Sequence, residues 1–161
     1  MFNYIQIFDS TLYPEILKLY QSNKDYFKLN DTEVTFQTVD EDVHAKPDSV
    51  LNENKKYFLV TDEFDKPKAV LDYLVDYPTT NVVYIGLFLV DKALQRKHIG
   101  RQIIREQLEK FRAMKKKAVR LGVLVENKSA IAFWESLGFV IIEENKQNTN
   151  GNLVHELELA L

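Results

Sequence analysis

An almost unbroken apolar run from Val82 to Val90 limits the folds that this chain can adopt. An apolar segment of this length, without polar residues at every second position, is typical of a central strand covered on both faces. The sequence therefore predicts a sheet with packed layers on both sides, and Val82 to Val90 is expected to be a strand at its centre.

The segments around this run alternate between strand patterns and amphipathic helix patterns. Apolar residues recur at helical spacing from Ile99 to Met114, directly after the central strand. Turn-forming residues at 62–67 and at 148–152 join two pairs of strands as hairpins. We expect further strands at 2–8, 57–61, 69–77, 119–125, 139–144 and 153–159, and further helices at 13–22 and 129–137. The segment 35–45 is either a short helix or part of a loop, because Pro47 and many acidic residues lie in this region. No repeat or linker divides the chain, so residues 1–161 are predicted to form a single domain with a mixed α/β (α+β) sheet.

Composition excludes several classes of function. The chain has no cysteine and only three widely spaced histidines, so neither a thiolate nucleophile nor a metal site is expected. The formal net charge of -3 argues against binding nucleic acid by neutralising phosphates. No window is apolar enough to cross a membrane and no signal peptide is apparent, so we expect a cytoplasmic protein that does not bind membranes.

The turn before the helix at 99–114 carries the strongest chemical signal. Arg96, Lys97 and Arg101 gather three positive charges at a helix start, where free N–H groups and the helix dipole favour an anion. The five glycines of the chain are too far apart for a P-loop or a dinucleotide-binding fingerprint. We infer a pyrophosphate ligand; the alternative is a basic helix start that binds nothing.

Two motifs in the second half of the chain resemble those of the GNAT superfamily of N-acetyltransferases. Gln95 and Gly100 match motif A, in which Gln or Arg is followed by two residues, Gly, any residue, and then Gly or Ala. The segment from Asn127 to Phe139 resembles motif B, with an Asn, an Ala, an aromatic pair and a closing Gly-Phe. The resemblance implies a GNAT-like, mostly antiparallel sheet of about seven strands flanked by about four helices and splayed at its two central strands.

The resemblance also implies acetyl-CoA as co-substrate and assigns residues to it. Leu89 and Val90 would pair with the pantetheine arm, and their strand would stabilise the oxyanion formed during transfer. The residues implied around the rest of the cofactor are Gln95, Arg96, Lys97, His98, Ile99, Gly100, Arg101, Asn127, Ala130, Phe133 and Trp134. For Phe133 and Trp134, plain core packing is an equally good interpretation.

Three departures from the family pattern affect the expected mechanism. His98 replaces a glycine, which would force an unfavourable backbone angle or place an imidazole beside the pyrophosphate. Trp134 replaces a tyrosine that protonates the leaving thiolate in many relatives, and an indole N–H cannot act as that acid. The positions where relatives carry a catalytic glutamate hold Tyr84 and Gly86. Tyr84 is therefore the candidate catalytic residue, lining a water path with Asp72 or Tyr73, and a structural role is its alternative.

The sequence thus favours an N-acetyltransferase that moves an acetyl group directly from acetyl-CoA to a primary amine of a small molecule or peptide. A homodimer is compatible with the sequence. The alternative is a CoA-responsive regulatory or interaction module that has kept the cofactor cleft and lost turnover, because no acid or base is obvious.

Overall fold

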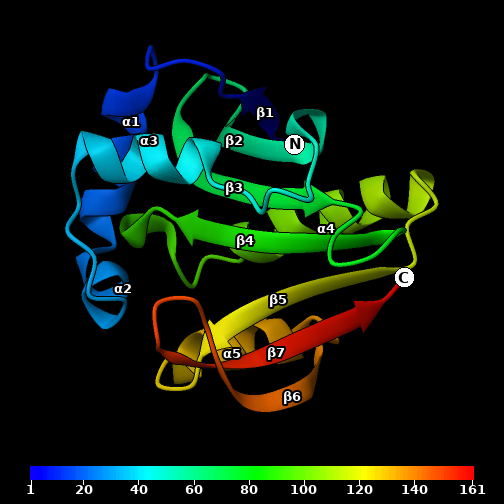
Figure 1. Cartoon of the computed structure of the whole chain (residues 1–161). Coiled ribbons are helices and arrows are strands. Elements are labelled where there is room, and N and C mark those ends of the chain that lie inside the picture. Colours follow the sequence, from blue (N-terminus) through cyan, green and yellow to red (C-terminus); the bar gives the residue numbers. More distant parts are fainter.

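The computed structural model describes all 161 residues and shows a seven-stranded sheet between two layers of helices (Figure 1). The strands follow the order β1-β2-β3-β4-β5-β7-β6 across the sheet, and only β4 and β5 pair in parallel. Their bounds are β1 (Asn3–Gln6), β2 (Lys55–Thr61), β3 (Pro67–Val75), β4 (Val82–Val90), β5 (Ala118–Leu124), β6 (Val140–Gln147) and β7 (Leu153–Ala160). The predicted mixed, mostly antiparallel sheet of seven strands is confirmed.

The chain has five α-helices, one more than the four expected. They are α1 (Tyr13–Ser22), α2 (Lys24–Leu29), α3 (Phe36–His44), α4 (Ile99–Ala113) and α5 (Lys128–Ser136), with short 3-10 turns η1 (Asn52–Asn54) and η2 (Lys92–Leu94). The extra helix is α2, whose six residues are too few to show a helical period. Packing holds it in place, because the ring of Phe27 stacks on Tyr20 of α1 with centroids 4.7 Å apart.

Local signals explain where the other helices begin and end. The α3 helix starts at a capping box, in which Thr35 and Thr38 each accept a hydrogen bond from the other's backbone N–H. The α5 helix begins after Asn127, whose side chain accepts from the N–H of Ala130. It is closed by Gly138, whose φ of 98° is the left-handed conformation that favours glycine at this position.

Each face of the sheet carries its own apolar core. The α4 and α5 helices cover one face, where Ile103, Phe111 and Trp134 pack against strand residues such as Leu71. The α1, α2 and α3 helices cover part of the other face, where Ile16 is among the buried residues. No helix is long and apolar enough to cross a membrane.

The two central strands pair over only part of their length. Val82 to Ile85 of β4 pair with Ala118 to Leu121 of β5, and no β4 residue after Ile85 has a partner on that side. Strand β5 pairs along its whole length with β7 instead. Figure 1 shows the ribbons of β4 and β5 close together at one end and diverging toward the other. The predicted splay of the sheet is thus present.

The core on the α4 side gives a test of stability. Phe111 is fully buried and its ring packs edge-on against Tyr73 at 5.0 Å. We predict that Phe111→Ala lowers the free energy of unfolding by about 3–5 kcal/mol, because it leaves a cavity that the sheet cannot fill. Urea denaturation measures the change. Phe64→Ala is the matched control, since Phe64 is 74% exposed in a turn, and its effect should stay within about 0.5 kcal/mol.

Candidate active site

The turn between β4 and α4 is held in an unusual backbone conformation. Both Arg96 (φ 63°) and His98 (φ 62°) are in the left-handed region, although neither is a glycine. His98 is the N-cap residue of α4 and makes no side-chain capping bond. The unfavourable backbone angle expected at His98 is therefore present. Non-glycine residues adopt this conformation at a cost, and such strain is common where a ligand binds.

This conformation leaves a row of backbone donors free. The N–H groups from Arg96 to Arg101 donate to no other group of the chain, and the first helical bond runs from the N–H of Gln102 to the carbonyl of His98 at 3.1 Å. The side chains of Arg96, Lys97 and His98 are exposed around them. Free N–H groups, the positive end of a 15-residue helix and two cationic side chains together form a site suited to a phosphate or pyrophosphate.

The remaining side chains of the turn have structural partners. Arg101 turns toward α5, where it donates to the hydroxyl of Ser136 at 2.7 Å. The amide of Gln95 donates to Asn23 Oδ1 at 2.8 Å and to the Val90 carbonyl at 3.1 Å. Buried Asn23 donates to the same Val90 carbonyl at 3.0 Å. Asn23 therefore ties α1 to the end of β4 and to the turn, a role that sequence reasoning missed.

The first turn of α4 lies against aromatic side chains from β4 and α5. A Cβ at Gly100 would lie 3.3 Å from Val90 Cγ2 and 3.6 Å from Phe133 Cε2, so the backbone approaches both closely. Partly exposed Phe133 stacks on Phe88 with centroids 6.2 Å apart. Trp134, in contrast, is only 6% exposed and packs within the core.

The motif at the start of α5 lies near the same opening of the sheet. Asn127 Oδ1 accepts from Ala130 N–H and from Ser129 Oγ, while its Nδ2 has no partner in the chain. Ala130 is half-buried behind it.

Beyond the last β4–β5 pair, β4 has backbone N–H groups without a partner on its β5 side, although the Val90 carbonyl accepts from Asn23 and Gln95. The Asp91 N–H donates to the Lys68 carbonyl of β3 at 2.9 Å. Because successive N–H groups of a strand point to opposite sides, the N–H groups of Val90 and Phe88 point toward the opening, and that of Leu89 points toward β3. Residues 91–95, whose N–H groups all have partners in the chain, connect this free edge to the turn with the unpaired N–H groups. An extended ligand could therefore contact both segments.

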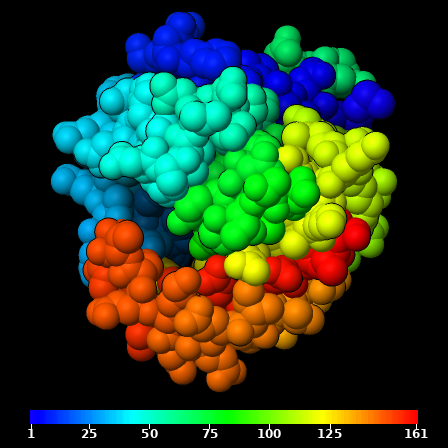
Figure 2. Space-filling view, turned by 45° about the vertical axis from the view of Figure 1, so that its right-hand side comes forward, coloured from blue at the N-terminus to red at the C-terminus, as the bar shows by residue number.

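The sheet face that α1 to α3 cover only in part is open at its centre. Gly86 of β4 and Gly122 of β5 are both exposed, although they lie in the two central strands. Tyr84 of β4 lies beside Gly122, with its hydroxyl 3.4 Å from where a Cβ of Gly122 would be. Figure 2 shows a hollow on this side of the molecule, bordered by the blue-to-cyan α2–α3 segment, the green segment before β4 and the orange β6–β7 hairpin.

Charged groups surround Tyr84 on this face. Glu156 of β7 is buried and accepts from Lys146 Nζ at 2.7 Å. Arg120 of β5 is paired with Glu158 of β7. Burial, followed by the negative charge of Glu156, raises the pKa of Tyr84, so its phenol stays protonated at neutral pH. Tyr73, the other tyrosine considered for a proton path, lies on the opposite face against Phe58 and Phe111.

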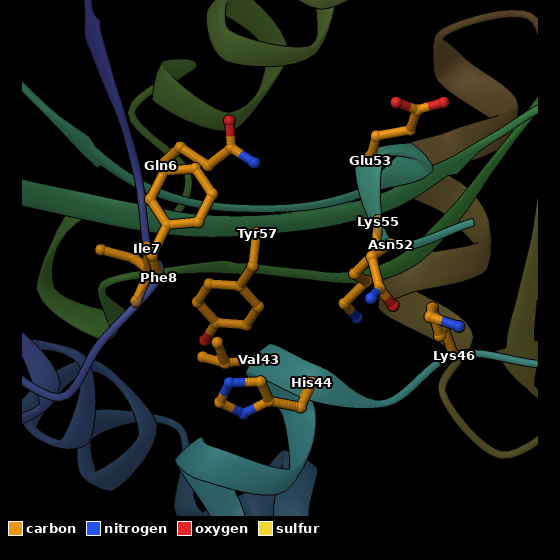
Figure 3. Close-up of a pocket in the computed structure, with 10 residues that line it drawn as sticks. All are labelled: Gln6, Ile7, Phe8, Val43, His44, Lys46, Asn52, Glu53, Lys55 and Tyr57. Atoms are coloured by element: carbon orange, nitrogen blue, oxygen red, sulfur yellow. The ribbon is translucent and has the colours of Figure 1, made fainter. Parts of the chain in front are cut away.

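A separate cavity of about 400 Å³ lies at the other edge of the sheet and contains none of the predicted site residues. Figure 3 shows Lys55 and Tyr57 projecting from β2 toward Val43 and His44 at the end of α3. The residues lining this cavity are Gln6, Ile7, Phe8, Val43, His44, Lys46, Asn52, Glu53, Lys55 and Tyr57.

Comparison with known proteins identifies the family. The sequence model of the Acetyltransferase (GNAT) family matches residues 16–139, which include both the turn and the start of α5. The chain belongs to this family. It is thus an acetyltransferase by family, with the fold that the two motifs indicated.

Individual relatives agree with this assignment. N-alpha-acetyltransferase 30 of Dictyostelium discoideum is 40% identical over 60 residues, a segment covering 37% of this chain and 32% of that protein. An acetyltransferase from Thermus thermophilus has a TM-score of 0.75 at 19% identity, covering 100% of this chain and 97% of that one. The ribosomal-protein-S18-alanine N-acetyltransferase of Escherichia coli has a TM-score of 0.70 at 18% identity, covering 99% of this chain and 94% of that one. The two structures establish a shared fold.

The strained turn gives a second test of stability. We predict that His98→Gly raises the free energy of unfolding by about 0.5–1 kcal/mol, because relief of the left-handed strain outweighs the entropy that glycine adds to the unfolded chain. Chemical denaturation measures the difference. Lys97→Gly is the matched control: Lys97 is not among the residues with positive φ, so glycine there should lower stability by a similar amount. Equal effects of the two substitutions would show that His98 is not strained.

Proposed function

We propose that this GNAT protein transfers an acetyl group from acetyl-CoA directly to a primary amine of a small molecule or peptide. The observation that carries the proposal is the presence, on neighbouring segments of the chain, of a free β4 edge and of the unpaired N–H groups of the turn from Arg96 to Arg101. Acetyl-CoA supplies the acetyl group as a thioester, and its pyrophosphate matches the cradle of N–H groups. Arg96 and Lys97 would hold the phosphates, and the free N–H groups of Phe88 and Val90 would pair with the extended arm.

The chain's own residues favour direct transfer. It has no cysteine and no Gly-x-Ser-x-Gly segment, so no obvious covalent nucleophile is present to carry the acetyl group as an intermediate. The neutral amine nitrogen would therefore bond directly to the acetyl carbon and form an oxyanion. The carbon–sulfur bond would then break, CoA would leave as its thiolate, and the proton lost from nitrogen would restore the thiol by way of solvent. The exposed glycines at the open face, Gly86 and Gly122, leave room for an amine to approach the free edge of β4 from the hollow in Figure 2.

A CoA-responsive module without turnover is the second candidate. Its support is Trp134, which is buried in the core and cannot provide the proton donor that a tyrosine provides in many relatives.

Release of free thiol from acetyl-CoA, measured with a panel of amines, separates the two functions. Peptides with free N-termini should come first, because the named relatives include N-acetyltransferases described by their α-amino or protein-alanine acceptors; a polyamine and lysine complete the panel. Turnover with any of them supports transferase activity. Calorimetric binding of acetyl-CoA without turnover on any acceptor would support the regulatory module.

The phosphate assignment predicts a specific kinetic pattern. Arg96→Ala and Lys97→Ala should each raise the KM for acetyl-CoA about tenfold, because each removes a charge-assisted hydrogen bond worth about 1.5 kcal/mol. The kcat should hardly change, since phosphate contacts stabilise ground and transition states alike. Lys92→Ala is the control, because Lys92 lies in η2, before the row of free N–H groups. A loss confined to kcat would exclude the phosphate role.

Tyr84 keeps a role in this proposal as a hydrogen-bond donor that positions the amine or a water molecule. Its protonated phenol cannot itself take up the amine's proton at neutral pH. Tyr84→Phe should therefore lower kcat/KM about tenfold, as expected for one lost hydrogen bond worth about 1.4 kcal/mol, with acetyl-CoA affinity unchanged. Tyr73→Phe is the matched control on the opposite face of the sheet. Equal rates for the two variants would remove Tyr84 from the site.

A further inference from the structure

A β-bulge lies at the point where the two central strands separate. Asp72 of β3 is paired with Leu87 of β4, but the next residue, Tyr73, is paired with Ile85, so Gly86 is the extra residue. Ile85 is also the last residue of β4 that pairs with β5. Exposed Gly86 therefore stands at the apex of the splay, where the open face of the sheet meets the free edge of β4.

A carboxylate from the neighbouring strand lies against this glycine. A Cβ built at Gly86 would be only 2.9 Å from Oδ2 of Asp72, so the carboxylate fills the space that a side chain of Gly86 would take. The other oxygen, Oδ1, lies 2.6 Å from Lys55 Nζ and is fully buried. The side chain of Asp72 is 12% exposed, and the carboxylate can be reached only through Oδ2.

Charged groups around Asp72 come from the strands and the helix packed on it. Lys55 of β2 is its ion-pair partner, and Asp42 of α3 adds a second negative charge nearby. The negative charge of Asp72 helps to raise the pKa of Tyr57 of β2. The Tyr57 hydroxyl is hydrogen-bonded to that of Tyr20, which donates to Asp42 at 2.8 Å. The adjoining part of β4, Gly86 and Leu87, has no titratable side chain. Burial raises the pKa of Asp72 to about 6, although Lys55 opposes the rise and Asp42 adds to it.

We propose that Asp72 is the catalytic base, accepting a proton through Oδ2 from the ammonium group of the acceptor, directly or through one water molecule. This inference rests on the proposed transferase function. One N–H bond of the ammonium breaks, one O–H bond forms on Asp72, and the proton then passes to bulk water, which leaves a neutral amine ready to attack. An alkylammonium with a pKa near 10.4 needs such a step at neutral pH. The base thus comes from β3, beside Gly86, and Lys55 keeps it ionised.

The test is the pH dependence of kcat/KM from about pH 5 to 10 with an acceptor identified in the amine panel. In the wild type, kcat/KM should rise with pH, and the rise should have an apparent pKa of about 6. In Asp72→Asn, kcat/KM at pH 7 should be about 10²- to 10⁴-fold lower than in the wild type. It should approach the wild-type value only as the pH nears the pKa of the amine. Glu156→Gln is the matched rival, because Glu156 is the other buried carboxylate with a lysine partner on this face. An unchanged profile in Asp72→Asn, or loss of the rise in Glu156→Gln instead, would overturn the assignment.

Two neighbouring substitutions should move the rise in opposite directions. Lys55→Met removes the positive charge that lowers the pKa of Asp72, so the rise should shift to higher pH. Asp42→Asn removes a negative charge that raises it, so the rise should shift to lower pH. A purely structural role for Asp72 predicts lower melting temperatures in both variants with the rise in its wild-type position, and that result would contradict the proposal.

Stability gives a measurement that does not depend on turnover. Folding raises the pKa of Asp72 above its ordinary value of 3.8, so the protonated side chain favours the folded state. The contribution of this raised pKa to the free energy of unfolding is complete below about pH 4 and is lost as pH rises through about 6. The difference in melting temperature between wild type and Asp72→Asn should therefore fall between about pH 4 and 7 and then stay constant. A constant difference would contradict the raised pKa.

If wild type binds acetyl-CoA and acetylates no amine, the transferase proposal fails and the role of Asp72 fails with it. If wild type turns over and the pH profile of kcat/KM is unchanged in Asp72→Asn, only the role of Asp72 fails.

Discussion

The extra residue at Gly86 determines how the centre of this sheet is organised. In a regular strand, Val83, Ile85, Leu87 and Leu89 would all face one side. Here Val83 and Ile85 belong to the core under α4 and α5, whereas Leu87 and Leu89 belong to the core under α1 to α3. One bulge therefore lets a single strand contribute to both cores. It also bends β4 at the residue where pairing with β5 ends, so the packing of both layers and the opening of the sheet have a common origin.

An open edge in the middle of a sheet would normally be unfavourable, because unpaired backbone groups are costly when they are removed from water. The chain satisfies part of this edge itself. The carbonyl of Val90 accepts from both Asn23 and Gln95, which fixes the end of β4 to α1 and to the turn. The N–H groups that remain at Phe88 and Val90 are separated from the free ones of Arg96 to Arg101 by residues 91–95, whose N–H groups all have partners in the chain. Free donors at such a position are best explained by a ligand that satisfies them, and this argument from the backbone is independent of the sequence motifs.

The sequence was most informative where the determining signals are local. The strand at 82–90 and the helix after it follow from hydrophobic period within short windows, and both are present. The prediction that the two central strands splay apart rested on the family resemblance. The α2 helix was missed because its six residues depend on the stacking of Phe27 on Tyr20. Asn23 could not be identified either, since its partner Val90 is 67 residues away in the chain and nothing in the sequence joins them.

Asp72 shows the same limit at the site itself. In the sequence it is one acid within a strand, considered only as a companion to Tyr84, and the absence of an acid at Tyr84 and Gly86 suggested that no base was present. The register between β3 and β4 changes this conclusion, because it places Asp72 across from Leu87 and against Gly86. A glycine in β4 is what makes room for a carboxylate from β3: any larger residue would occupy the position of Oδ2. The absence of an acidic residue in β4 and the presence of Gly86 therefore belong together, because the glycine leaves space for the carboxylate of Asp72 from β3. Either of the two neighbouring strands can supply a carboxylate at the apex of the splay.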